Sequence, residues 1–395
     1  MSLAFLRGQV SFMRAHGFEV RAVSSPGKAL AEFAEQEGAE GVAIPMTREI
    51  SPGRDVGALR ALRKVLRQIR PAIVHSHTPK GGLLGMCAAW LARVPVRVYH
   101  LRGLPFVTAT GKRRALLRMT ERVACRLAHR VICVSHSVRQ VVIDDGLCPP
   151  DKIIVLAGGS GNGVDAEGRF NPDSLEVGTR EAVRSKWNVP TDARVIGFIG
   201  RLVRDKGLVE LTEAFATIRD DYPNAYLLLV GPEEERDPVP AEVLQQLRAD
   251  DRVRMVGEEW NTPPLYAAMD LVVLPTYREG FPNVPLEAAS MGRPVVATRI
   301  PGCVDAVADG ETGTLVPPQD ARALATAIKS YLDAEALRRA HGDAGRQRVL
   351  REFRQEVIWQ ALYDEYCRLL KARGLTLPAA EDSSSEFKRG VATEG

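Results

Sequence analysis

Short apolar runs alternate with longer amphipathic stretches along almost the whole of this 395-residue chain. The short runs predict strands, and apolar residues at helical spacing between them predict helices. Alternation of this kind favours parallel sheets with helices packed on both faces. The predicted strands cover residues 19–23, 72–75, 96–101, 130–134 and 153–156, and then 195–199, 225–230, 253–256, 271–274 and 294–297. The clearest predicted helices cover residues 55–69, 112–128, 207–220 and 321–332.

A glycine-rich stretch at 158–163 and a polar segment at 165–179 divide this series in two. The length allows two domains of about 150–200 residues, each able to bury its own core. The sequence therefore predicts an α/β chain of two Rossmann-like, doubly wound domains, residues 1–165 and residues 166–352. A second amphipathic stretch, 349–370, predicts a C-terminal helix at about 353–373 that joins the first domain, and 375–395 predicts a disordered tail.

The start of the chain departs from this pattern. A doubly wound domain begins with a buried strand and a glycine-rich turn, whereas residues 3–16 already have the pattern of a helix. We therefore expect the first domain to lack its first strand, and we favour a truncated start as the reason.

Charge is distributed unevenly along the chain. Residues 1–165 hold 24 Lys and Arg against 12 Asp and Glu, and the remainder holds 29 against 37, so the first part carries +12 and the second −8. A basic half joined to an acidic half predicts a polyanionic surface or ligand near the first half.

Several classes of protein are disfavoured by composition. The longest mostly apolar stretch without charge, residues 81–92, is far shorter than the ~20 residues of a membrane-spanning helix. No export signal opens the chain, and no cysteine pair or Cys/His cluster has metal-ligand spacing, so we expect a cytoplasmic protein with reduced cysteines and no metal. The six cysteines are Cys87, Cys125, Cys133, Cys148, Cys303 and Cys367.

The first chemical motif is VIGFIGRLVRDKG at residues 195–207. Gly200 ends a predicted strand and allows a ligand to approach the backbone closely. Arg201 and Lys206 follow, and an arginine fork and a lysine point charge can bind one anion together. A polar loop with solvated charges has the same pattern, so this motif alone is weak evidence.

The second motif is YREGFPNVPLEAASMGRP at residues 277–294. Pro285 fits a helix start with Asn283 as N-cap, which would aim the backbone amides of Asn283 and Val284 at an anion. Glu287 falls in the expected first turn, where a carboxylate also simply complements the helix dipole. Glu279 has no comparable structural explanation. Gly280, Phe281 and Pro282 follow it directly, so we expect its carboxylate to be buried.

Taken together, these motifs resemble those of a family-4 glycosyltransferase of the GT-B fold, in which two Rossmann-like domains face a cleft. Glu279 and Glu287 match the family's two glutamates separated by seven residues, Arg201 and Lys206 match its Arg/Lys pair, and the run at 301–317 is also similar. The resemblance covers roughly residues 2–370.

The resemblance implies a retaining enzyme that needs no metal at the diphosphate. It implies that Arg201 and Lys206 stabilise the departing nucleoside diphosphate, that Glu279 binds hydroxyls of the transferred sugar, and that Glu287 binds the ribose. Gly200, Phe281, Pro282, Asn283 and Val284 would complete the donor site of a nucleotide-sugar, most simply a UDP-sugar.

The first domain would then hold the acceptor. Residues 73–82 (IVHSHTPKGG) resemble the family's strand-end loop, with His77, Thr78 and Lys80 toward the cleft. Residues 158–165 (GGSGNGVD) resemble the subgroup that extends polyprenyl-diphosphate-linked glycans for capsule, exopolysaccharide or lipopolysaccharide. Residues 98–106 (VYHLRGLPF) depart from the family pattern, because Arg102 stands where a histidine is commoner and His100 lies two positions earlier.

A predicted helix at 112–130 carries seven cations, Lys112, Arg113, Arg114, Arg118, Arg122, Arg126 and Arg130, against one acid, Glu121. Leu116, Leu117, Val123 and Leu127 give it an apolar side. A solvated basic face is one interpretation. The other is docking on the anionic inner face of the cytoplasmic membrane through Lys112, Arg113, Arg114, Arg118 and Arg122, where each cation contributes about 1 kcal/mol. Nucleic acid fits poorly, because no aromatic stacking platform accompanies the charge.

Three other functions share some of these features. A GT-B-fold UDP-sugar epimerase has the same architecture and donor, but it would need no basic acceptor domain. A glycosyltransferase acting on a soluble acceptor and a non-catalytic donor-binding subunit are the others. The intact set of Glu279, Glu287, Arg201 and Lys206 argues against the last of these.

Overall fold

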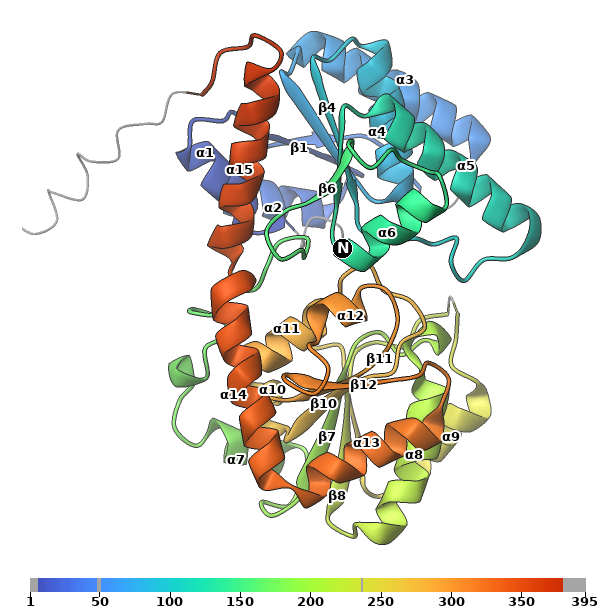
Figure 1. Cartoon of the computed structure of the whole chain (residues 1–395), viewed down its shortest axis with the longest axis vertical. Helices are drawn as coiled ribbons and strands as arrows, with labels where there is room; N and C mark the ends of the chain where they lie inside the picture. The colour runs from blue at the N-terminus through green and yellow to red at the C-terminus, as the bar shows by residue number, and fades with distance from the viewer. Residues whose placement is uncertain (1–5, 48–50, 236, 379–395) are drawn as a thin grey trace, which may run out of the picture.

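A computed structural model describes residues 6–47, 51–235 and 237–378. Two parallel-sheet domains lie one above the other in Figure 1, with the first domain at the top and the second at the bottom. Two consecutive C-terminal helices, α14 (Glu335–Glu352) and α15 (Gln355–Lys371), run down one side of both domains. The predicted α/β architecture of two Rossmann-like domains is thus what the chain adopts.

The strands of the first domain form two separate parallel sheets. One sheet has the order β1–β2, and the other has the order β3–β4–β5–β6. In a doubly wound sheet the first strand lies between the strands that correspond here to β1 and β3. Among the described residues no strand occupies that place, as expected from the sequence. The strands are β1 (Arg21–Ser24), β2 (Glu40–Ala43), β3 (Ile73–His77), β4 (Val96–Leu101), β5 (Arg130–Cys133) and β6 (Ile153–Val155).

Helices cover both faces of the four-stranded sheet. Tyr99, Leu101 and Val131 point toward the layer that contains α5, whereas Val98 and Ile132 point toward α15 and α1. The helices are α1 (Gln9–Ala15), α2 (Lys28–Glu37), α3 (Pro52–Ile69), α4 (Pro79–Leu91), α5 (Gly111–Leu127) and α6 (His136–Asp144). The predicted helix at 3–16 was wrong at its start: α1 begins after the left-handed Gly8, and residues 1–5 lie outside the described part.

The second domain contains one six-stranded parallel sheet of order β12–β11–β10–β7–β8–β9. Its two faces bury separate apolar clusters, one under α8, α9 and α13 and the other under α7, α10, α11 and α14. The strands are β7 (Arg194–Ile199), β8 (Ala225–Val230), β9 (Val253–Gly257), β10 (Leu271–Leu274), β11 (Val295–Thr298) and β12 (Gly313–Val316). The helices are α7 (Thr179–Lys186), α8 (Leu208–Asp221), α9 (Ala241–Ala249), α10 (Pro263–Ala268), α11 (Asn283–Ser290), α12 (Cys303–Ala306) and α13 (Ala321–Asp333).

The glycine-rich stretch at 158–163 meets the end of α14. Val164 donates a backbone hydrogen bond to the carbonyl of Phe353 (2.8 Å), and a Cβ at Gly163 would lie only 2.7 Å from the same oxygen. Helix α14 therefore ends before Phe353, and α15 falls within the C-terminal helix predicted at about 353–373. The next helix, α15, returns to the first domain and packs against α1 and the four-stranded sheet.

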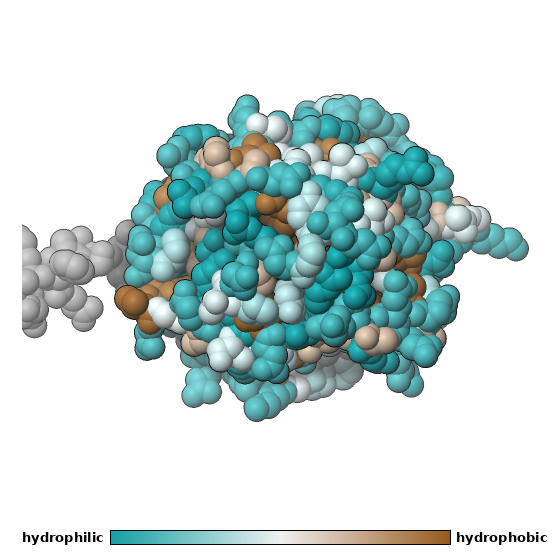
Figure 2. Space-filling model, turned by 90° about the horizontal axis from the view of Figure 1, so that it is seen from below, coloured by the Kyte–Doolittle hydropathy of each residue, from teal (hydrophilic) through white to brown (hydrophobic). Residues whose placement is uncertain are grey.

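The predicted tail at 375–395 was wrong at its first residues, because Leu375 and Leu377 pack against the cluster around α15. The rest of that tail, residues 379–395, lies outside the described part. None of the helices in the described ranges combines the length and apolarity needed to cross a membrane. The end of the molecule formed by the second domain presents a mainly hydrophilic surface with small scattered apolar areas (Figure 2).

Candidate active site

The predicted donor residues gather at the carboxyl ends of the second domain's strands, where ligands bind in open α/β sheets. Lys206 follows β7 and Glu279 follows β10, the neighbouring strand of the sheet. The Lys206 ammonium donates to a carboxylate oxygen of Glu279, and both side chains are mostly buried. A cation and a carboxylate are thus held together at the carboxyl edge of the sheet, where the first could bind a phosphate and the second sugar hydroxyls.

Local backbone geometry fixes Lys206 in this place. Gly207 ends the loop in a left-handed conformation (φ 72°), and a Cβ there would lie 2.0 Å from the carbonyl oxygen of Pro275. Thr276 donates its hydroxyl hydrogen to the carbonyl of Asp205 (3.1 Å), and Arg278 donates to the Asp205 carboxylate (2.7 Å). These contacts brace the loop after β7 against the loop after β10.

Arg201 forms an ion pair with a residue that the sequence did not indicate. Its guanidinium donates to Glu234 Oε2 at 2.7 Å, and Glu234 belongs to the loop after β8. Gly200 approaches this loop closely, because a Cβ at Gly231 would lie 1.9 Å from the Gly200 carbonyl oxygen. Glu234 was not predicted from the sequence, although three consecutive glutamates shortly after a strand are a signal that could have identified it.

The helix start near Asn283 was predicted one residue too late. The N-cap of α11 is Pro282 in extended conformation, no side chain caps the helix, and Asn283 is already helical. The first backbone N–H groups of an α-helix, here those of Asn283 and Val284, lack intrahelical acceptors and can bind an anion. Phe281, just before them, packs its ring on Phe353 with centroids 5.5 Å apart.

Glu287 lies beyond the first turn of α11, contrary to the sequence expectation, so dipole complementarity does not explain it. The Tyr266 hydroxyl, from α10, donates to Glu287 Oε2 at 2.8 Å. Burial raises the pKa of Glu287, and the Tyr266 hydrogen bond and Arg169 partly oppose that rise. Tyr266 was not singled out from the sequence, where nothing distinguishes it from a core tyrosine.

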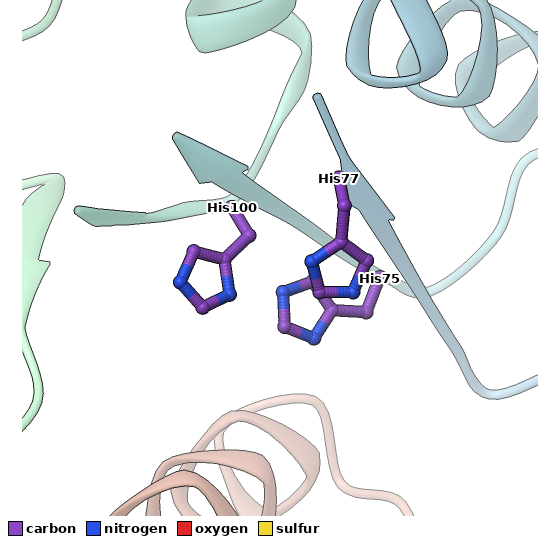
Figure 3. Close-up of side chains that lie close together, drawn as sticks. All are labelled: His75, His77 and His100. Carbon is purple, nitrogen blue, oxygen red and sulfur yellow. The ribbon is translucent and has the colours of Figure 1, made fainter. Parts of the chain in front are cut away.

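Three histidines lie together at the carboxyl end of the first domain's sheet (Figure 3). His75 and His77 share one face of β3, and His100 of β4 pairs in register with His77. The rings of His75 and His100 are stacked with centroids 5.2 Å apart, and His75 Nδ1 contacts the Tyr366 hydroxyl of α15 at 2.5 Å. Both ring nitrogens of the buried His100 lack a hydrogen-bond partner among the described residues.

Arg102 joins this histidine cluster. Its Nε donates to His77 Nδ1 (3.2 Å), and its Nη2 donates to the carbonyl of Gly161 (3.2 Å) in the glycine-rich stretch. Burial, followed by the charge of Arg102, lowers the pKa of His75 to about 3, and the pKa values of His77 and His100 are also well below normal. The histidines are therefore neutral at pH 7.

Three neutral histidines with ring nitrogens within 4.8 Å of one another raise the question of a metal. Two features of the arrangement argue against metal binding. The rings of His75 and His100 are parallel to within 5°, so their lone pairs lie in separate parallel planes, whereas a metal needs lone pairs that converge. His77 Nδ1 accepts a hydrogen bond from Arg102, so its other nitrogen carries the hydrogen in the neutral ring.

The remaining predicted acceptor residue, Lys80, lies in the first turn of α4. Its ammonium pairs with Asp55 of α3 at 2.6 Å and donates to the Thr47 hydroxyl at 3.2 Å. His75 and Tyr366, which were not predicted from the sequence, lie in the histidine cluster that contains His77, His100 and Arg102.

The acceptor-side loop and the donor-side loop touch across the interface between the domains. A Cβ at Gly280 would lie 1.9 Å from the carbonyl oxygen of Arg102 and 3.0 Å from Gly103 Cα. Glu279 and Arg102 therefore lie on adjoining loops that meet where the carboxyl ends of both sheets face each other. Two Rossmann-like domains, of which one is basic and the other carries Arg201, Lys206 and two glutamates at its strand ends, are the arrangement expected of a GT-B glycosyltransferase.

Comparison with known proteins identifies the family. Residues 179–348 match the sequence model described as glycosyl transferases group 1, and residues 4–159 match the glycosyl transferase 4-like domain. The chain is 35% identical to the capsular polysaccharide biosynthesis glycosyltransferase CapM of Staphylococcus aureus over 370 residues, covering 94% of this chain and 95% of the relative. The chain therefore belongs to the family-4 glycosyltransferases.

Two other similar proteins are associated with UDP. An Escherichia coli protein named UDP-Gal:alpha-D-GlcNAc-diphosphoundecaprenol alpha-1,3-galactosyltransferase is 28% identical over 74% of each chain. The crystal structure of Anabaena HepE in complex with UDP superposes with a TM-score of 0.77 at 22% identity, covering 93% of this chain and 96% of HepE. At that identity the likeness to HepE concerns the fold.

Proposed function

We propose that the chain is a retaining glycosyltransferase that moves a sugar from a UDP-sugar to a polyprenyl-diphosphate-linked saccharide in cell-surface polysaccharide synthesis. The observation that carries this proposal is the Lys206–Glu279 pair beside the open N-terminus of α11. Lys206, Arg201 and the first amides of α11 would neutralise the leaving diphosphate, and Glu279 would accept hydrogen bonds from sugar hydroxyls. Glu287, held by Tyr266, would accept hydrogen bonds from the ribose.

In this proposal the departing diphosphate itself accounts for retention of the configuration at the anomeric carbon. A phosphate oxygen on the donor face takes the proton of the acceptor hydroxyl, so neither glutamate acts as a nucleophile. The protein's part is to orient the two substrates and to stabilise the charge of the diphosphate. We propose that no metal takes part, because Arg201 and Lys206 supply the positive charge.

The choice of UDP and of a lipid-linked acceptor rests on relatives. The name of the E. coli relative gives a UDP-sugar donor and an undecaprenyl-diphosphate acceptor, and that of a Campylobacter jejuni relative, 27% identical over 78% of this chain, also gives an undecaprenyl-diphosphate-linked acceptor. In this chain the histidine cluster with Arg102 adjoins the Glu279 loop and would bind the acceptor. The neutral imidazoles can donate and accept hydrogen bonds, and Arg102 can pair with a phosphate.

A membrane-linked acceptor implies contact with the membrane surface, and we propose that α5 makes it. Along the exposed side of this helix, Leu116, Met119 and Val123 follow one another at helical spacing. Arg118 pairs with Asp145 at 3.1 Å and holds α5 to the end of α6. An apolar stripe bordered by cations fits a surface of anionic lipid headgroups. The exposed cations around the stripe are Lys112, Arg113, Arg114, Arg122 and Arg126.

A donor-hydrolysis screen tests the proposed reaction. The wild-type protein is incubated with UDP-, GDP- and dTDP-sugars, with and without a synthetic polyprenyl-diphosphate saccharide, and with and without EDTA. The proposal expects release of UDP that the lipid-linked acceptor accelerates and EDTA leaves unchanged, with an α-linked product from an α-linked donor. Epimerised sugar in the absence of acceptor would overturn the proposal. Transfer to the same saccharide without its polyprenyl diphosphate, and not to the lipid-linked form, would also overturn it.

A further inference from the structure

The first turn of α6, in the first domain, is bound to the second domain by a set of polar contacts that no donor or acceptor role explains. The backbone N–H of His136 donates to Asp305 Oδ1 at 3.0 Å, and that of Ser137 donates to both oxygens of the same carboxylate at 3.3 Å. Asp305 belongs to α12, which follows β11. It satisfies N–H groups that a helix N-terminus leaves without intrahelical acceptors, and its charge faces the positive end of the helix dipole.

The two serines of this turn complete the contact. The Ser137 hydroxyl donates to Asp305 and accepts from the backbone N–H of Gly302 (2.7 Å). The Ser135 hydroxyl accepts from Val138 N as the N-cap of α6 and donates to the carbonyl of Gly280 (2.8 Å). Each hydroxyl therefore uses its single donor on the second domain.

These contacts reach the donor loop directly. Gly280 follows Glu279 in the chain, and a Cβ at Gly302 would lie 2.5 Å from the Gly280 carbonyl oxygen, so the segments around 280 and 302 are in close contact. The contact at Ser135 fixes the carbonyl that immediately follows the sugar-binding glutamate. Separation of the domains would replace Ser135 by water at this carbonyl, and the loop would lose its fixed support.

We propose that Ser135, Ser137 and Asp305 form an inter-domain latch that holds the Glu279 loop in its working position only when the two domains are closed. They are positioning residues, since their described contacts join the two domains and support the Glu279 loop. The latch makes assembly of the donor site depend on closure onto the acceptor domain. This limits loss of the activated sugar to water while the cleft is open. The consequence for turnover rests on the proposed function, but the latch itself is testable without turnover.

The test compares Asp305→Ala and Ser137→Ala with Asp320→Ala. Asp320 is the matched control, because its carboxylate also caps a helix N-terminus (Ala323 N, 2.8 Å) but within the second domain. Amide hydrogen exchange is followed in the segment 276–284 of the unliganded proteins. A hydrogen bond to a charged group is strong enough to shift a local opening equilibrium by about tenfold or more. We expect exchange to rise about tenfold in both latch variants and to stay at the wild-type rate in Asp320→Ala.

Calorimetric titration with UDP and a kinetic assay form the second arm. The latch variants are expected to bind UDP within about threefold of wild type and to lose kcat about tenfold, while Asp305→Asn, which keeps an acceptor oxygen, recovers part of it. Unchanged exchange at 276–284, or the same change in the Asp320→Ala control, would overturn the latch. Wild-type protein that fails to bind UDP would instead overturn the proposed donor and leave the exchange result standing.

Discussion

The ammonium of Lys206 and the carboxylate of Glu279 form an ion pair between the loops that follow two neighbouring strands, β7 and β10. Without a donor, each group neutralises the other in a mostly buried site. In the proposed function, a diphosphate would replace Glu279 on the cation, and a sugar would replace Lys206 on the carboxylate. The Lys206–Glu279 site is thus ordered before a substrate binds, and this lowers the free-energy cost of ordering it on binding.

Lys206→Ala and Glu279→Ala should each abolish transfer while the protein stays folded. Loss of one group that stabilises developing charge typically costs about 10²–10³ in kcat. The measurement is UDP release in the presence of the lipid-linked acceptor, with circular dichroism to check the fold. Lys329→Ala removes another lysine of the second domain, one that pairs with Asp221 at the surface (2.5 Å), and should keep wild-type turnover. Turnover within about threefold of wild type in either site variant would contradict the assignment.

Glu234→Gln should tighten UDP binding. Glu234 holds the Arg201 guanidinium at 2.7 Å, so the diphosphate must compete with a carboxylate for this cation. A neutral amide competes less well, because it lacks the negative charge that attracts the guanidinium and has only one acceptor oxygen. We expect the Kd for UDP from calorimetry to fall by about three- to tenfold. Glu233→Gln is the matched control, because Glu233 pairs with the exposed Arg248 instead (2.5 Å). Weaker binding in Glu234→Gln would show that Glu234 itself contacts the nucleotide.

The motifs identified the loops of the site, but the sequence could not reveal the partners of their residues. Strand–helix alternation was sufficient to predict two Rossmann-like domains, and the spacing of Glu279 and Glu287 indicated the loop after β10 as part of the candidate site. The weak strands β2 and β12 have too few apolar residues to be distinguished from loops, and the break at Phe353 depends on a contact with residue 164. The pairings of Arg201 with Glu234 and of Asp305 with α6 join segments far apart in the chain, and no local pattern predicts such contacts.

Charge reversal on α5 should release the protein from anionic membranes. The exposed cations Lys112, Arg113, Arg122 and Arg126 each contribute about 1 kcal/mol near a negatively charged surface, so Glu at all four should weaken binding by more than about a hundredfold. The assay is sedimentation with vesicles of phosphatidylglycerol and phosphatidylcholine, at low and high salt. Equal binding of the α5 variant and the wild type would mean that this helix is simply solvated.

The control for this experiment makes the same change in net charge on the second domain. In this control variant, four exposed cations of the second domain are changed to Glu together. The control variant should bind the vesicles more tightly than the α5 variant does. These cations are Lys186, Arg322, Arg339 and Arg351. Equal weakening in both variants would show that net charge, rather than the α5 surface, determines binding.

Low pH should destabilise the first domain through the histidine cluster. Burial and the charge of Arg102 lower the pKa of His75 to about 3, whereas in the unfolded chain its pKa is 6.5. Between these values the unfolded state binds a proton that the folded state does not, so the free energy of unfolding falls as the pH decreases below 6.5. Each such histidine contributes a slope of about 1.4 kcal/mol per pH unit.

His75→Asn isolates this effect, because an asparagine amide can still reach the Tyr366 hydroxyl but does not titrate in this range. Urea unfolding of the wild type and the variant at pH 6.5, 5.5 and 4.5 should show the smaller loss of stability in His75→Asn, by about 1 kcal/mol per pH unit. The exposed His136, changed to Asn, serves as the control and should follow the wild type. If the stability of the wild type and of His75→Asn changes equally with pH, His75 is charged in the folded protein. The interpretation of the cluster as three neutral histidines would then be wrong.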